Sequence, residues 1–161
     1  MSIFYRQHTP SSIITSESDL LFDSSSIGSR TILANTLVQG DILHILLEGY
    51  LVEVNNNRAE IRLLVNEIIQ AQTPNLDRQN KISSNLLIEF YITISTIGSS
   101  GVAYLTGKYI YGMANQKDIG TTFINYTLNI DTTIDNTIKL MVKTGDNDIS
   151  LQIYTAFLEL L

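Results

Sequence analysis

Cysteine and tryptophan are absent from the chain, and charged residues are few. Without cysteine there are no disulfides, no thiolate nucleophile and no thiolate ligands for zinc. Charged residues make up 16% of the 161 residues, against roughly 25% in an average soluble domain. A chain of this length supports one domain with its own core, but so few charges leave a lone molecule with little well-solvated surface.

The charges that are present are mainly acidic, and they exclude one class of partner. Asp and Glu number 16 against 10 for Lys and Arg, so the net charge is −6 and the pI is about 4.7. Nucleic-acid binders set clustered basic side chains against phosphate, so we expect no nucleic-acid partner. No apolar run resembles a secretory signal or the roughly 20 residues of a membrane-spanning helix. We therefore expect synthesis in a cytosol and no membrane insertion.

β-Branched residues dominate the composition. Ile, Val and Thr make up more than a quarter of the chain, and branching at Cβ suits the pleated sheet. Apolar and polar residues alternate with a period of two, as in half-buried strands, over 86–96, 121–130, 138–143 and 149–157. In the last segment this alternation places Phe157 on the apolar face and Ala156 on the other. Together these runs predict an all-β antiparallel sandwich or barrel of about eight to ten strands.

Turn-forming residues separate these segments. The asparagine triplet 55–57 lies between 41–54 and 59–72. Because asparagine tolerates the left-handed backbone of tight turns, we expect those two segments to pair as a long hairpin. Glycine supplies the same freedom in 98–101 and 144–148, which we expect to connect pairs of strands in the same way.

One segment, 59–70, fits two structures. As a helix it places a stripe of aliphatic residues on one side, namely Ile61, Leu64, Val65, Ile68 and Ile69. As a strand it alternates Ile61, Leu63 and Val65, with a bulge near Glu67 that shifts the phase. The strong strand and the asparagine triplet before it favour the hairpin.

The sequence contains few histidines and lacks several common catalytic motifs. His8 and His44 are the only histidines, and neither belongs to an HExxH motif. His44 is surrounded by aliphatic residues, so we expect an ordinary hydrogen-bonded strand residue. The sequence contains no GxSxG elbow, no P-loop and no GxGxxG motif. We therefore expect no enzyme, no catalytic residue and no cofactor.

Two acidic clusters invite a comparison with metal sites. Asp146 and Asp148 could offer oxygen ligands to calcium, but they lack the spacing and the final glutamate of an EF-hand loop. Asp131 and Asp135 suit turns, because aspartate side chains bond to the backbone of the next residues. We expect no metal. A hydrolase with two carboxylates about 5 to 10 Å apart stays open as an alternative.

Three tyrosines are the candidate binding residues. Tyr104, Tyr109 and Tyr111 lie on one predicted strand, and parity separates Tyr104 from the other two. One set should reach the core and the other should face outward. An outward tyrosine can stack on a sugar or become buried in a subunit contact. The alternative is that these side chains only cap the sandwich, with their hydroxyl groups in water.

The segment 41–54 is apolar on both parities. One parity carries Ile42, Leu46, Tyr50 and Val52, and the other carries Leu43, Ile45, Leu47 and Leu51. A sandwich strand covered on one side only does not need this pattern. We therefore expect one sheet face to meet another copy of the chain, in an assembly closed by cyclic symmetry.

Three segments resemble parts of a known family. The run 129–143, with TTIDNTIKL at its centre, resembles the closing strands of small jelly-roll virion proteins of tailed phages and large DNA viruses. The segment 36–45 is similar to the T-L-x-x-G-D start of the first long strand in those proteins, and 97–101 fits their central loop. Lys143 and Thr144 stand where that family usually has a tryptophan.

The resemblance implies a fold, an assembly and a location. The fold would be a jelly-roll β-sandwich over 31–161, with an N-terminal strand or arm and a serine-rich loop over 1–30 as part of the same domain. The protein would be a homo-oligomer, commonly a trimer, and would serve with other virion proteins as a capsid, spike or fibre-head component. It would be located in the virion after synthesis in the host cytoplasm. The family has no catalytic residues to transfer.

Carbohydrate binding is the second function that the sequence supports. Loops of a β-sandwich that present tyrosine, asparagine and aspartate suit a glycan. The two functions are compatible, since a spike head that attaches to a host can bind a host glycan.

Overall fold

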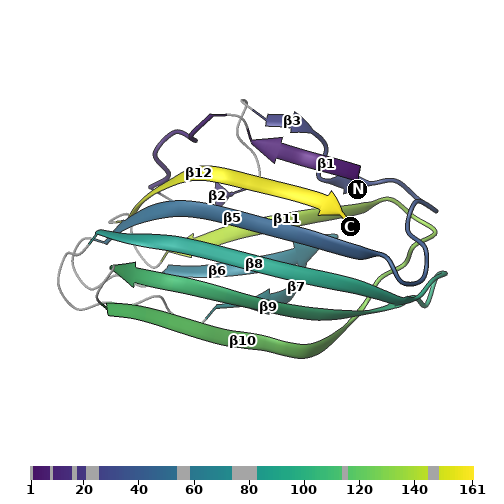
Figure 1. Cartoon of the computed structure of the whole chain (residues 1–161). Coiled ribbons are helices and arrows are strands. Elements are labelled where there is room, and N and C mark those ends of the chain that lie inside the picture. The colour runs from purple at the N-terminus through teal and green to yellow at the C-terminus, as the bar shows by residue number, and fades with distance from the viewer. Residues whose placement is uncertain are drawn as a thin grey trace.

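The computed structural model consists of two antiparallel β-sheets packed face to face (Figure 1). It describes residues 2–7, 9–15, 18–20, 26–53, 59–73, 83–113, 116–144 and 149–161. The all-β antiparallel sandwich predicted from the sequence is confirmed. Within these ranges every regular element is a strand, and no helix is long and apolar enough to cross a membrane.

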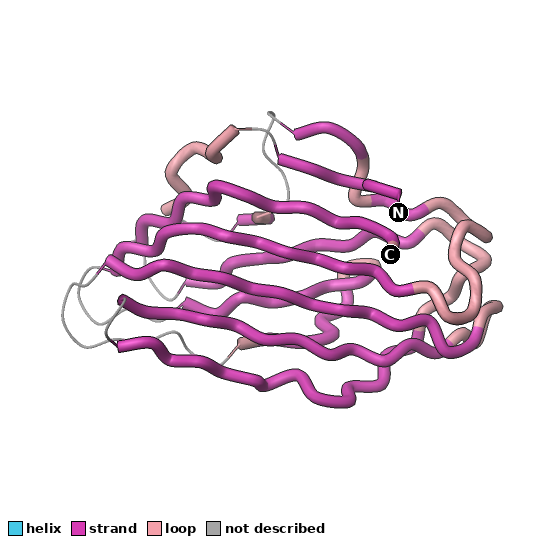
Figure 2. The backbone as a smooth tube through the Cα atoms, in the orientation of Figure 1, coloured by secondary structure: helices cyan, strands magenta, loops and turns pink. Residues whose placement is uncertain are grey.

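The strands follow the β-rich segments of the sequence closely. Their bounds are β1 (Ser2–Gln7), β2 (Ser18–Asp19), β3 (Ser26–Gly28), β4 (Thr31–Ile32), β5 (Ile42–Glu53), β6 (Ala59–Val65), β7 (Ile68–Gln72), β8 (Ser83–Thr96), β9 (Val102–Met113), β10 (Gln116–Asn129), β11 (Asn136–Thr144) and β12 (Ile149–Leu160). The longest strands, β5, β8, β9, β10 and β12, all lie in one sheet (Figure 2).

The larger sheet has seven strands in the order β10-β9-β8-β5-β12-β1-β3. The smaller sheet has the order β2-β11-β6-β7, and β4 also pairs with β11. Four of the pairs are nested along the chain: β1 with β12, β2 with β11, β5 with β8, and β6 with β7. Strands from the two ends of the chain therefore pair with one another, and β1 and β2 join the same sheets as the later strands.

The core lies between the two sheets, where their apolar faces meet. On β8 the alternation predicted from the sequence is confirmed, because Ile88, Phe90 and Ile92 are fully buried. The smaller sheet contributes Ile138, Leu140 and Val142 from β11 in the same way. Full burial of one such side chain stabilises the fold by about 1.5–3 kcal/mol relative to exposure.

The predicted hairpin between 41–54 and 59–72 is wrong. Strand β5 lies in the larger sheet and β6 in the smaller one, so the chain changes sheets between them. The hairpin is β6 with β7, joined by a two-residue turn at Asn66 and Glu67. Both turn residues have positive φ, 51° and 66°, as a type I′ turn requires. This turn stands where the bulge near Glu67 was expected, and the pairing of β6 with β7 instead shifts register between Leu63 and Leu64. The segment is not a helix. The asparagine triplet lies outside the described residues.

Two other expectations about connections had different outcomes. The segment 98–101 joins β8 to β9 as a hairpin, as predicted. The segment 144–148 does not join a hairpin, because β11 and β12 lie in different sheets. Each of these strands instead pairs with strands from the first half of the chain. Residues 145–148, with Asp146 and Asp148, lie outside the described residues.

The predicted face of Phe157 is also wrong. The pairing of β12 with β5 shifts by one residue between Ile153 and Thr155. The shift reverses the alternation after this point. Ala156 and Leu158 are therefore buried in the core, and Phe157 lies on the opposite side of the sheet.

Candidate functional site

The face of the larger sheet that points away from the core is the first candidate site, and we call it the outer face. On β5, the odd-numbered Leu43, Ile45 and Leu47 are buried in the core. The even-numbered side chains therefore lie on the outer face: Ile42, His44, Leu46, Glu48 and Tyr50.

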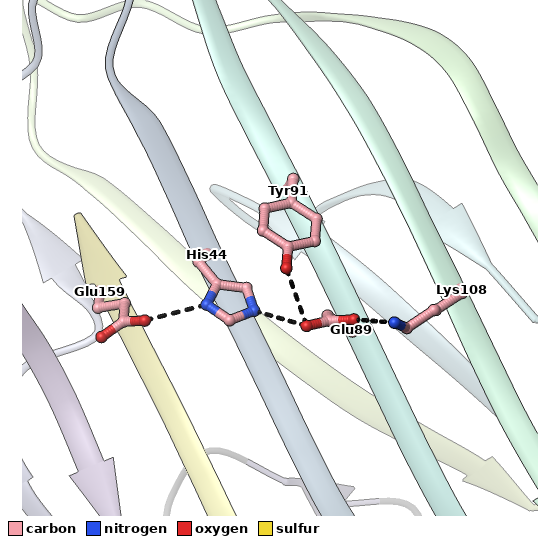
Figure 3. A network of polar contacts seen from close by, with 5 residues as sticks. All are labelled: His44, Glu89, Tyr91, Lys108 and Glu159. Carbon is pink, nitrogen blue, oxygen red and sulfur yellow. Dashed lines mark hydrogen bonds and ion pairs between the residues drawn. The ribbon is translucent and has the colours of Figure 1, made fainter. Parts of the chain in front are cut away.

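His44 is the centre of a polar network on the outer face (Figure 3). Its Nδ1 lies 3.0 Å from Oε1 of Glu159 on β12, and its Nε2 lies 3.0 Å from Oε1 of Glu89 on β8. Glu89 also accepts a hydrogen bond of 2.9 Å from the Tyr91 hydroxyl. Its other oxygen forms an ion pair of 2.6 Å with Lys108 on β9. The sheet order β12-β5-β8-β9 brings these side chains together.

The ring of His44 is held on both edges and on one face. Both of its nitrogens lie within hydrogen-bond distance of carboxylate oxygens, one on each neighbouring strand. A neutral ring donates from one nitrogen and a protonated ring from both. The ring of Tyr91 stacks on His44 at a centroid distance of 4.5 Å and an interplanar angle of 5°. These contacts fix the orientation of the ring on the outer face.

Hydrogen bonds in the network hold Glu89 ionised. The bond from Lys108 lowers the pKa of Glu89 most, desolvation raises it, and the bonds from Tyr91 and His44 lower it further. The hydrogen bond with Glu89 in turn raises the pKa of Tyr91 and of Lys108. Because carboxylates occupy both nitrogens of His44, the ring has none left to accept a proton from a nucleophile. His44 is therefore a hydrogen-bonded strand residue, as predicted.

The network also explains part of the apolar pattern of β5. Tyr91 covers one face of the His44 ring, and Phe157 packs against it edge-on at 5.1 Å. His44 is consequently only 9% exposed, and Leu46 beside it is half-buried. Neighbouring strands of the same molecule thus cover much of the outer face of β5, so its two-sided apolar pattern does not by itself require a second copy.

An open hollow of about 410 Å³ lies on the larger sheet beyond this network. Its lining comes from β5, β8, β9 and β12. The residues are Glu48, Gly49, Asn85, Leu86, Leu87, Ile110, Gly112 and Tyr154. Among the described residues of the lining, Glu48 is the one carboxylate, whereas a two-carboxylate hydrolase needs a pair.

The predicted tyrosines do not gather into one site. Tyr104 is 48% exposed, whereas Tyr109 is partly buried against the core, so parity separates them as predicted. For Tyr111 only the backbone is described, opposite Leu86 on β8. The tyrosine that does line the hollow is Tyr154, also 48% exposed, and the sequence pattern did not single it out.

A second candidate site is one end of the sandwich, which we call the loop end (Figure 2, right). It consists of residues 33–41, 66–69, 97–101 and 131–136. Backbone hydrogen bonds tie these segments together: the Asn35 amide donates to the Thr132 carbonyl at 2.7 Å, and the Thr132 amide donates to the Gly98 carbonyl at 3.1 Å. The loops therefore hold one another in place.

Asn136 organises the polar atoms of the loop end. It is 1% exposed, and its amide donates to the carbonyls of Asp131 at 2.7 Å and Ile134 at 3.0 Å. Its side-chain oxygen accepts a hydrogen bond of 2.9 Å from Asn66 in the β6–β7 turn. One buried amide thus connects two of the segments.

The carboxylates of the loop end also bond within it. Asp131 accepts from the backbone and hydroxyl of Thr133, at 2.9 and 2.6 Å, which confirms its predicted turn-forming role. Asp135 instead accepts from the Ala34 amide at 2.8 Å and so joins two loops. With these polar groups bonded locally, aliphatic side chains project into solvent at 47–64% exposure, namely Leu33, Val38, Ile68, Ile69, Ile97 and Ile134.

Metal ligands are not gathered in the part of the chain that the structure describes. No group of three or more His, Asp or Glu side chains there is placed to hold an ion. His8, the other histidine, lies outside that part. Comparison with known proteins adds no assignment, since no protein-family model, no curated protein and no solved structure matches the chain.

Proposed function

We propose that this chain is a non-enzymatic, homo-oligomeric structural protein of a virion, a jelly-roll component of a capsid, spike or fibre head. The observation that carries the proposal is the loop end, where aliphatic side chains are exposed on loops that hydrogen bonds hold in place. A trimer is the assembly that the family resemblance implies, and attachment to a host is a role compatible with it.

The nested strand pairs support the jelly-roll part of the proposal. Jelly rolls of viral capsid and lectin domains are built from eight strands in two sheets. Setting aside β3, β4 and the β9–β10 hairpin leaves the sheets β1-β12-β5-β8 and β2-β11-β6-β7. In these sheets the first strand pairs with the last, the second with the next to last, and so on inward. The β9–β10 hairpin then extends one sheet at its edge.

The fixed geometry of the loop end favours its use as a contact surface. Leu33 and Val38 project from a segment whose backbone is bonded to the neighbouring loop and to β8. Residues already held in place lose little conformational freedom on binding, so more of the free energy gained by burying them contributes to association. The cores of interfaces are poor in charged groups. The loop end does carry carboxylates, but Asp41, Asp131 and Asp135 already accept hydrogen bonds from backbone amides of the loops, and Glu67 is paired with Lys139.

A second copy is the partner that these features suit best. The chain carries few charges overall, and the exposed aliphatic side chains of the loop end can pack against the same side chains of a second copy. Copies that meet through the same aliphatic side chains bury them on both partners at once. Closed cyclic symmetry then limits the assembly to a small number of subunits.

A charge placed at the loop end tests this proposal. Leu33 is 64% exposed, so Leu33→Glu should leave the fold intact and disrupt an apolar contact between copies. Sedimentation velocity should show the oligomer of the wild type dissociating in the variant. Ile13 is 62% exposed and lies beside the start of β12, at the other end of the sandwich, so Ile13→Glu is the matched control. An oligomer that is equally stable in both variants would exclude the loop end as the interface.

A further inference from the structure

The residues that line the hollow on the outer face include a glycine, Gly112, which leaves space beside Asn85. On the outer face Asn85 lies opposite Gly112, and Leu87 lies between Glu48 and Ile110 on the neighbouring strands. Gly112 has no side chain, so nothing projects from β9 beside Asn85, and the next position in the row is Lys117 on β10, of which only the backbone is described. The φ of Gly112, 140°, is a backbone conformation that favours glycine. The space beside Asn85 therefore depends on this glycine.

Tyr154 reaches the rim of the hollow through a β-bulge. Gly49 pairs with Ile153 and Glu48 pairs with Thr155, so Tyr154 is the extra residue between them. A bulge changes the direction of a side chain, and bulges are frequent beside binding sites. Gly49 permits the close approach of the strands here, since a Cβ atom at this position would lie 2.7 Å from the backbone oxygen of Gln152.

The polar side chains of the hollow are free for a ligand. Among the residues that the structure describes, Glu48 and Asn85 make no side-chain hydrogen bond or ion pair. Both side chains are exposed. The half-buried Leu87 lies next to Asn85 on the same face of β8 and opposite Glu48 on β5. The half-buried Ile110 lies opposite Leu87 on β9. A volume of about 410 Å³ falls within the usual range for small-ligand sites.

The geometry points to a neutral saccharide as the ligand of this hollow. A sugar ring has apolar C–H groups that pack on an aromatic face, here Tyr154, and hydroxyl groups that both donate and accept hydrogen bonds. The carboxylate of Glu48 accepts from such hydroxyls, and the amide of Asn85 does both. Among the described residues of the lining there is no Lys or Arg, the side chains that usually bind phosphate-bearing and other anionic ligands.

The position of the hollow excludes an extended peptide that adds a strand to the sheet. Its lining lies on β5, β8, β9 and β12, and each of these strands is already paired on both sides. No backbone edge is available there for an additional strand. Because the site needs only one molecule, its existence does not depend on the assembly proposed above.

Titration of the labelled wild-type protein with neutral mono- and disaccharides at millimolar concentration, followed by amide NMR, tests the inference. The amide signals of Gly49 and Gly112 should shift and saturate, and that of Tyr104 should not. Tyr154→Ala should weaken the binding about tenfold, and Tyr104→Ala should change it by no more than about twofold. The control is matched, since both tyrosines are 48% exposed and lie on the same sheet.

A third variant distinguishes a sugar from an organic cation. Glu48→Gln keeps a hydrogen-bonding group and removes the charge, so saccharide binding should persist, weakened by no more than about threefold. If choline shifts the same amides and Glu48→Gln abolishes that binding while no saccharide binds, the saccharide assignment is overturned. It is also overturned if no saccharide shifts these signals, or if Tyr154→Ala binds like the wild type. Sedimentation of Tyr154→Ala, with an unchanged mass, separates this result from a loss of assembly.

Discussion

The outer face of the larger sheet and the loop end are each organised by one buried polar side chain, and they expose opposite chemistry. Around His44, charged groups pair with one another across four strands of the larger sheet. Around Asn136, neutral amides and local carboxylates bond to backbone groups, and methyl groups face outward. The first region stabilises the folded chain through charge. The second bonds its polar groups locally and leaves aliphatic side chains exposed for a partner.

Replacement of His44 should have the largest effect on the free energy of unfolding. His44→Ala leaves Glu89 and Glu159 without the ring that lies between them, and a buried carboxylate that loses its hydrogen-bond partner costs more than the roughly 1–3 kcal/mol of a neutral group. Because both carboxylates keep some contact with solvent, at 12% and 14% exposure, we expect a loss of about 3 kcal/mol. Urea denaturation measures the loss, and sedimentation should show the subunit number of the folded variant unchanged. A loss of oligomer at native stability would place the interface on the outer face.

Replacement of Asn136 should lower the free energy of unfolding by less than replacement of His44, and it should also weaken association between copies. Asn136→Ala leaves the carbonyls of Asp131 and Ile134 without their donor, which costs about 1–3 kcal/mol. The loops that carry the exposed aliphatic residues would then lose their fixed positions. We expect both a lower midpoint in urea and weaker association in sedimentation. Association as tight as in the wild type would show that the order of these loops is irrelevant to assembly.

Acid should lower the stability that the His44 network provides and leave the hydrogen bonds of Asn136 unchanged. This is the smallest of the three effects on stability. The pKa of Glu89 is lowered in the folded chain, so its ionised form is favoured by folding. The stability it contributes is fully present above about pH 4.5, the ordinary value, and is lost as the pH falls through the lowered pKa. Urea midpoints measured from pH 7 down to pH 3 should fall less steeply in Glu89→Gln than in the wild type. Asn136→Ala removes no titrating group and should keep the wild-type slope; equal slopes in all three proteins would contradict this assignment.

The inner face of the larger sheet could be predicted from the sequence, whereas the outer face could not. The alternation of Ile88, Phe90 and Ile92 is a local pattern and needs no knowledge of the partner strands. His44 is separated from Glu89 by 45 residues and from Glu159 by 115. Their contact depends on which strands pair and in which register, and no local pattern encodes this. The pair of Glu89 and Lys108 is the exception. These residues lie opposite each other in the β8–β9 hairpin, so the turn at 98–101 was enough to predict their contact.

The errors in the predicted connections have a related cause. The asparagine triplet indicated a reversal of the chain, but a turn signal does not reveal whether the next strand stays in the same sheet. Asn66 and Glu67 form a two-residue turn without glycine, so the usual sequence signal of a type I′ turn was missing there. The bulge at Tyr154 depends on the partner strand, and it changed both the face of Phe157 and the lining of the hollow. The candidate site therefore emerged only when the strands were placed side by side.

The mass of the wild-type protein in solution shows most directly whether copies of the chain associate, as the exposed aliphatic side chains of the loop end predict. Sedimentation or light scattering over a wide range of dilution gives this mass without any substitution. We expect one species of about three times the chain mass of 18.0 kDa, which persists on dilution. A single species of 18.0 kDa at every concentration would contradict this expectation, because the aliphatic side chains of the loop end would then have no copy of the chain to cover them.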